Sequence, residues 1–132
     1  MNLPLLAANI IILLAFFVHV FMGDKAFNII QPLTNSDNYI NKQRVWTMAR
    51  GAFHAVSVDI FCLNILLPVI NFTDLIPNEN FILKLVSIYL LLWAVVWIVI
   101  LLLSKHFQNK FFRLGQWILF LILAGLIYWG SM

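Results

Sequence analysis

Polar and ionisable residues interrupt an apolar stretch that runs from Arg44 to Asn64. Such side chains are costly inside a membrane-spanning helix, and they normally face a bundle interior, a water-filled cavity or a partner. At 100° per residue, one face of a helix over this stretch carries Trp46, Arg50, His54, Ser57, Phe61 and Asn64. Asp59 falls on a different face. We therefore expect this helix to hold whatever site the chain has.

The residue types suggest binding rather than covalent chemistry. The candidate ligand-binding residues are Arg50, His54, His19, Asp59, Ser57 and Asn64. Arg50, His54 and Asp59 could form a series of polar groups that a proton, an ion or a small ligand contacts as it crosses the membrane. The alternative is that these side chains hydrogen-bond between helices and only hold them together.

His19 and His54 are the residues that would ligate a metal ion or a haem, because imidazole nitrogen is a common ligand. They belong to different predicted helices, and no His-x3-His or Glu-x2-His pair accompanies them. Hydrogen bonding inside the bundle is the competing interpretation. The sequence leaves any cofactor unknown.

The sequence does not predict a catalytic site. Ser57 has no evident base and acid partners, and Cys62 faces away from His54. Cys62 is the only cysteine, so a disulfide within the chain is impossible. In an apolar helix, we expect this thiol to behave as a small hydrophobic side chain. The prediction therefore leans away from an enzyme.

Composition predicts a membrane protein. Of the 132 residues, 64% are hydrophobic and 10% are charged, whereas a soluble domain has roughly 25% charged residues. The formal net charge of +3 does not indicate nucleic-acid binding. The basic residues lie in loops beside apolar runs, where they set orientation and contact lipid headgroups.

Four apolar runs predict an all-α, integral membrane four-helix bundle, formed as a single transmembrane domain over residues 1–132. The predicted spans are residues 3–22, 44–70, 81–103 and 111–129. Small residues line up with His19 on one face of the first span, so this face is expected to pack inward. Gly23, Asp24 and Lys25 mark its exit from the membrane, and an amphipathic extension is expected to continue towards Pro32.

Basic residues predict the orientation. They flank the first and third loops: Lys25, Lys42, Arg44, Lys105, Lys110 and Arg113. By the positive-inside rule these loops lie in the cytoplasm, and both termini lie outside. Arg50 then lies close enough to the boundary for its guanidinium to reach the headgroups. Asp59 lies deeper, at the level of Asn9, Ser87 and Tyr89.

Three short motifs carry a resemblance: His19-x3-Gly23, Ile30-x-Pro32-Leu33 and Phe53-His54-x2-Ser57. They resemble a pattern in small bacterial membrane proteins of no known activity. In those proteins tryptophan usually precedes the second histidine, whereas Phe53 stands at that position in this chain. The resemblance implies a small four-span protein of the bacterial cytoplasmic (inner) membrane with a paired-histidine signature.

Three functional classes follow from these patterns. Small size and short loops favour a non-catalytic accessory, assembly or interaction subunit, which packs in the lipid bilayer against another membrane protein or a second copy. The first alternative is binding or translocation of a proton, ion or small ligand through a polar core of Arg50, His54 and Asp59. The second is a haem- or metal-binding redox component that uses His19 and His54.

Overall fold

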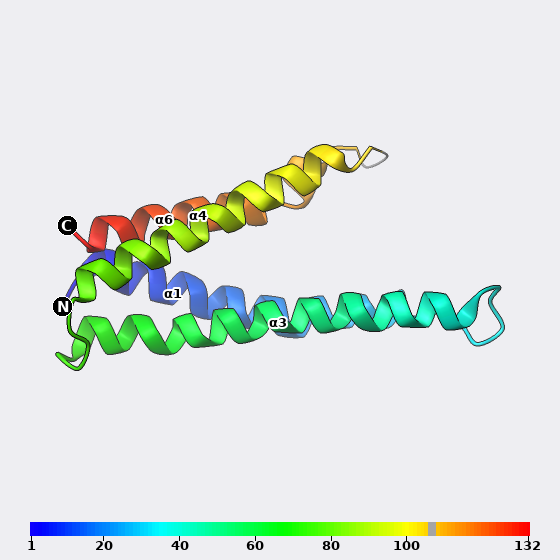
Figure 1. Ribbon diagram of the computed structural model, residues 1–132, viewed down its shortest axis with the longest axis horizontal. Coiled ribbons are helices and arrows are strands. Elements are labelled where there is room, and N and C mark those ends of the chain that lie inside the picture. Colours follow the sequence, from blue (N-terminus) through cyan, green and yellow to red (C-terminus); the bar gives the residue numbers. More distant parts are fainter. Residues whose placement is uncertain (106–107) are drawn as a thin grey trace. The chain divides into compact units, whose positions relative to one another are not determined.

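The computed structural model describes residues 1–105 and 108–132, and every regular element within them is helical (Figure 1). In chain order the elements are α1 (Leu3–Phe17), the π-helical turn η1 (Val18–Gly23), α2 (Asp24–Ile29), α3 (Tyr39–Phe72), α4 (Glu79–Leu103), α5 (Lys110–Arg113) and α6 (Gln116–Gly130). The all-α prediction is confirmed.

Three helical segments are long and apolar enough to cross a membrane. They are Leu3–Ile29 with 27 residues, Tyr39–Phe72 with 34 and Glu79–Leu103 with 25. At a rise of about 1.5 Å per residue, each exceeds the roughly 30 Å of a hydrocarbon core. The first segment joins α1, η1 and α2 without a break, so the extension expected beyond residue 22 is present and ends at Ile29.

The last apolar run differs from the expected continuous span over residues 111–129. It is divided into α5 and α6, because Leu114 adopts a non-helical backbone conformation (φ −119°, ψ 63°). Trp97 donates its indole N–H towards the Leu114 carbonyl (3.4 Å) and the Gln116 side chain (3.2 Å). These bonds from α4 satisfy polar groups at the break. The remaining α6 has 15 residues, and is about 22 Å long at the usual helical rise.

The described residues form two compact units, whose boundaries lie inside α1 and α3. Residues Met1–Asn9 and Leu67–Met132 make up one unit, and Ile10–Leu66 make up the other. In the first unit α4 lies beside α6 (Figure 1). Ser87 joins these two helices by donating its hydroxyl to the Ala124 carbonyl at 2.8 Å.

In the first unit, hydrogen bonds of Asn2 and Asn71 join the N-terminus to the end of α6 and to the end of α3. Asn2 donates its side-chain amide to the Gly130 carbonyl at 2.7 Å, and its backbone N–H to the side chain of Asn71 at 2.6 Å. The Asn71 amide in turn donates to the Asn2 carbonyl at 3.2 Å. Gly130 is the last residue of α6, where carbonyl groups have no partner within the helix, so the bond from Asn2 satisfies one of these groups.

The second unit is a helical hairpin. The segment from Ile10 through η1 and α2 returns through residues 30–38 into α3, and the two arms lie side by side (Figure 1). Asn38 takes a left-handed backbone conformation (φ 57°) directly before α3. Asn78 and Asn109 do the same before α4 and α5. Asparagine tolerates this conformation better than most residues, which fits it for these turns into a helix.

Candidate polar cluster in the helical hairpin

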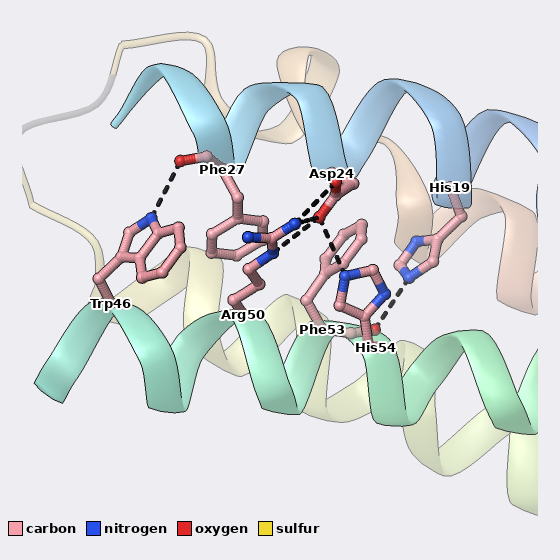
Figure 2. Close-up of polar contacts among 7 residues, drawn as sticks. All are labelled: His19, Asp24, Phe27, Trp46, Arg50, Phe53 and His54. Carbon is pink, nitrogen blue, oxygen red and sulfur yellow. Dashed lines mark hydrogen bonds and ion pairs between the residues drawn. The ribbon is translucent and has the colours of Figure 1, made fainter. Parts of the chain in front are cut away.

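An ion pair joins the two arms of the hairpin (Figure 2). Arg50 on α3 donates from Nε to Oδ1 of Asp24 at 2.8 Å, and from Nη2 to Oδ2 at 2.9 Å. Asp24 is the first residue of α2, 26 positions earlier in the chain. Two parallel bonds between a guanidinium and a carboxylate fix the geometry of both groups, as a single charge contact does not.

His54 binds the same carboxylate. Its Nε2 lies 3.0 Å from Oδ1 of Asp24, one helical turn beyond Arg50 on α3. Because an ionised carboxylate only accepts hydrogen bonds, Nε2 of His54 carries the proton of this bond. We call Asp24, Arg50 and His54 the Asp24 cluster. The three side chains keep 28%, 33% and 41% of their surface exposed, respectively, so the cluster is only partly enclosed.

His19 lies next to the cluster and holds η1 against α3. Its ring is stacked on that of Phe53, with centroids 3.8 Å apart and planes 14° from parallel. Its Nε2 lies 3.1 Å from the Phe53 carbonyl oxygen. A carbonyl oxygen accepts only, so Nε2 of His19 is also the protonated nitrogen.

Aromatic residues continue the contact between the two arms towards the tip of the hairpin. Trp46 donates its indole N–H to the Phe27 carbonyl at 2.9 Å. The guanidinium carbon of Arg50 lies 5.2 Å from the centre of a Trp46 ring, in the range of a cation–π contact. Phe27 also packs against Phe53 at a centroid distance of 5.1 Å. The predicted face of α3 is therefore confirmed for Trp46, Arg50 and His54, which all contact the other arm (Figure 2).

Asp24 was absent from the sequence-predicted site, and the π-helical turn explains why. At 100° per residue Asp24 lies well away from the face of His19, five positions earlier. Through η1 the helix is wider, with i to i+5 hydrogen bonding. This winding brings residues five apart towards one face, so His19 and Asp24 both reach α3 (Figure 2). The signal available in the sequence was a lone carboxylate near one end of the first apolar run, opposite Arg50.

The expectation that the Arg50 guanidinium reaches the headgroups stays a prediction, and the structure adds a protein partner for this group. Its Nε and Nη2 are both bound to Asp24, and the group lies over Trp46. Asp24 was expected only to mark the exit from the membrane. A carboxylate in reach holds an arginine more specifically than lipid does, because both charges are satisfied by matched donors and acceptors.

The other sequence-predicted site residues lie further along α3, outside the Asp24 cluster. Ser57 is buried, and its hydroxyl has no hydrogen-bond partner among the described residues. Asn64 donates its amide to the Ile60 carbonyl (3.0 Å) and towards that of Ile12 (3.5 Å), which ties α3 to α1. Asp59 is partly buried, five positions beyond His54. The structure thus brings Arg50, His54 and His19 together, and the Asp24 cluster as defined does not include these three residues.

Metal or haem ligation by His19 and His54 stays a prediction. Both imidazoles use Nε2 to donate to protein oxygen atoms, so ligation through that nitrogen would require breaking these bonds. In residues 1–105 and 108–132, His, Cys, Asp and Glu form no group of three or more that could hold a metal ion. In the Asp24 cluster one carboxylate already accepts hydrogen bonds from a guanidinium and an imidazole, an arrangement that suits charge pairing within the protein.

The fold and this cluster define an all-α protein that has helices long and apolar enough to cross a membrane and a charged contact between two helical segments. Comparison with known proteins adds no family: no family model, no curated protein and no solved structure matches the chain.

Proposed function

We propose that the chain is a small, non-catalytic accessory or assembly protein of a membrane complex. The observation that carries this proposal is the state of the Asp24 cluster: its charges bind one another, yet each side chain keeps between 28% and 41% of its surface open. Charged groups satisfied in this way are poorly suited to binding a substrate. Their open surface is costly against lipid, and a second protein would cover it.

The distance of the Asp24 cluster from the far ends of its two helices supports this interpretation. From Leu3 to Asp24 the helix rises about 31 Å, and from Arg50 to Phe72 about 33 Å, at about 1.5 Å per residue. Both arms therefore put the cluster roughly one hydrocarbon thickness from their far ends. The ion pair then lies at the edge of the apolar core, where it fixes the hairpin and leaves its remaining faces for packing.

The proposal includes an orientation and a membrane. The basic residues beside the first and third loops place these loops in the cytoplasm and both termini outside. The paired-histidine resemblance suggests the bacterial inner membrane. The partner would be another membrane protein or a second copy of this chain.

Site-specific photocrosslinking tests the proposed partner. A photoreactive residue at Gly51, next to Arg50, has open space around it, because nothing lies within 4 Å of a Cβ added there. We expect one discrete protein adduct on irradiation in native membranes. The matched control is Val95, an exposed residue of α4. Adducts with lipid alone at Gly51, together with a monomeric mass in mild detergent, would contradict an assembly role.

A second candidate is binding or translocation of a proton or small ligand. It is favoured by the convergence of Arg50 and His54 on one partly open carboxylate. Liposome flux separates this candidate from the first: His54→Ala and Asp24→Asn should each abolish flux if the cluster conducts. Unchanged flux in both variants, or none in the parent protein, would remove it.

A further inference from the structure

An apolar groove lies at the tip of the hairpin, between the Asp24 cluster and residues 30–38. It forms where residues 30–38 fold between the end of α2 and the start of α3, and its volume is about 610 Å³. Its apolar walls include Phe27, Ile30, Leu33, Val45 and Ala49. This volume is in the usual range for small-molecule sites.

The walls of the groove expose large hydrophobic side chains. Ile30 is 65% exposed, Leu33 72% and Val45 62%. Exposed apolar surface that is gathered in one place marks a site for a ligand, a membrane or a protein. The occupant of this groove therefore has an apolar body.

Trp46 supports a position of the groove at the boundary between acyl chains and headgroups. Its ring lines the groove, and its N–H is bound to the Phe27 carbonyl. Tryptophan favours this boundary in membrane proteins because its ring is apolar and its N–H is polar. The Asp24 cluster, one turn deeper on α3, is itself about one hydrocarbon thickness from the far end of both arms.

The charge at this end of the hairpin is positive. Lys42 is exposed and lines the groove. Lys25 and Arg44 lie nearby in the sequence, and Asp37 is the only acidic residue between Lys25 and Val58. Basic residues at the headgroup level attract anionic lipids. An apolar groove with a lysine among its lining residues fits a molecule that has an apolar chain and a negative head.

We infer that this groove binds one anionic phospholipid of the surrounding bilayer. Its acyl chain lies along Ile30, Leu33 and Val45, and its phosphate pairs with Lys42. This site is separate from the proposed partner role of the Asp24 cluster, and either can hold without the other.

Native mass spectrometry of the full chain, titrated with phosphatidylglycerol or with phosphatidylcholine of the same acyl chains, tests the inference. We expect one phosphatidylglycerol to bind at least fivefold more tightly than phosphatidylcholine. Lys42→Met keeps the length of the side chain and removes its charge, so it should bring the two affinities together. Arg44→Met removes a neighbouring charge that does not line the groove, and should preserve the preference. Equal losses in both variants would show general surface attraction and overturn the site.

A second pair of variants tests the groove itself. Ala49→Phe fills it and should lower the affinity for both lipids at least fivefold. Ala55→Phe adds the same volume at an exposed position of α3 outside the groove, and should change neither affinity. Equal effects of both substitutions would contradict the inference.

Two further results would assign the groove to another occupant. Displacement of phosphatidylglycerol by equimolar palmitate would assign it to a free fatty acid, and a dimer that is lost in Ala49→Phe would assign it to a second copy of the chain. Either result overturns the phospholipid.

Discussion

Arg50 and Asp24 meet through two parallel hydrogen bonds, from Nε to Oδ1 at 2.8 Å and from Nη2 to Oδ2 at 2.9 Å. A guanidinium presents two donors in a fixed plane that matches a carboxylate, which the ammonium of lysine cannot do. The pair joins α3 to the start of α2, directly after the π-helical turn. The contact therefore fixes both the spacing of the two arms and the rotation of the first arm about its axis.

Gly23 is expected to be required for the close contact between η1 and α3. A Cβ at Gly23 would overlap the ring of Phe53, which His19 holds by stacking on it. Gly23→Ala should therefore lower the free energy of unfolding by about 1–3 kcal/mol, the usual cost of overpacking. Thermal and denaturant unfolding in detergent micelles measure this change.

Gly51 provides the matched control for that substitution. It also lies in a helix of the hairpin, but nothing lies within 4 Å of a Cβ added there. Gly51→Ala should stabilise the protein by about 0.5–1 kcal/mol through helix propensity alone. Combining Gly23→Ala with Phe53→Leu should recover part of the loss. If Gly23→Ala is as stabilising as Gly51→Ala, the close approach of η1 to α3 is incorrect.

Two buried serines should respond differently to removal of the hydroxyl. Ser87 donates to the Ala124 carbonyl between α4 and α6, so Ser87→Ala should cost about 1 kcal/mol. The hydroxyl of Ser57 has no partner among the described residues, so Ser57→Ala should be neutral or stabilising by up to about 1 kcal/mol. Unfolding curves of the two variants, measured side by side, check the difference. A larger loss in Ser57→Ala would reveal a partner for that hydroxyl.

Asn78 should tolerate glycine and resist β-branched residues. Its φ of 56° is left-handed, and α4 begins at the next residue. Asn78→Gly should change stability little, whereas Asn78→Val should cost about 1–2 kcal/mol. Asn80 lies inside α4, and the same valine substitution there should cost only its helix propensity, under about 1 kcal/mol. Equal losses at both positions would argue against the left-handed turn.

The helices themselves could be predicted from the sequence because apolar runs of sufficient length require a helix in a membrane. The ends were less predictable. The second span was expected from residue 44, but α3 begins at Tyr39, because the polar residues before the apolar run continue the helix. At the break, the Leu114 carbonyl accepts a hydrogen bond from Trp97 of α4, a contact between helices that hydropathy does not record.

The site was predictable on one helix and not on the other. The face of Trp46, Arg50 and His54 follows from regular α-helical spacing, and the structure confirms it. Their partner Asp24 follows only from the π-helical turn, which changes the spacing by one residue. Asp59 was predicted to lie deeper than Arg50 and to belong to the same polar core, yet the carboxylate that binds Arg50 is that of Asp24.

A double-mutant cycle in the full chain tests the Asp24 cluster most directly. Asp24→Asn and Arg50→Gln each remove one charge of the ion pair while keeping a polar side chain. We expect each single variant to unfold more readily than the parent protein, because it leaves the opposite charge without its partner. The double variant should lose less stability than the sum of the two single losses. Additive losses, with no coupling between the two positions, would contradict a direct contact between Asp24 and Arg50.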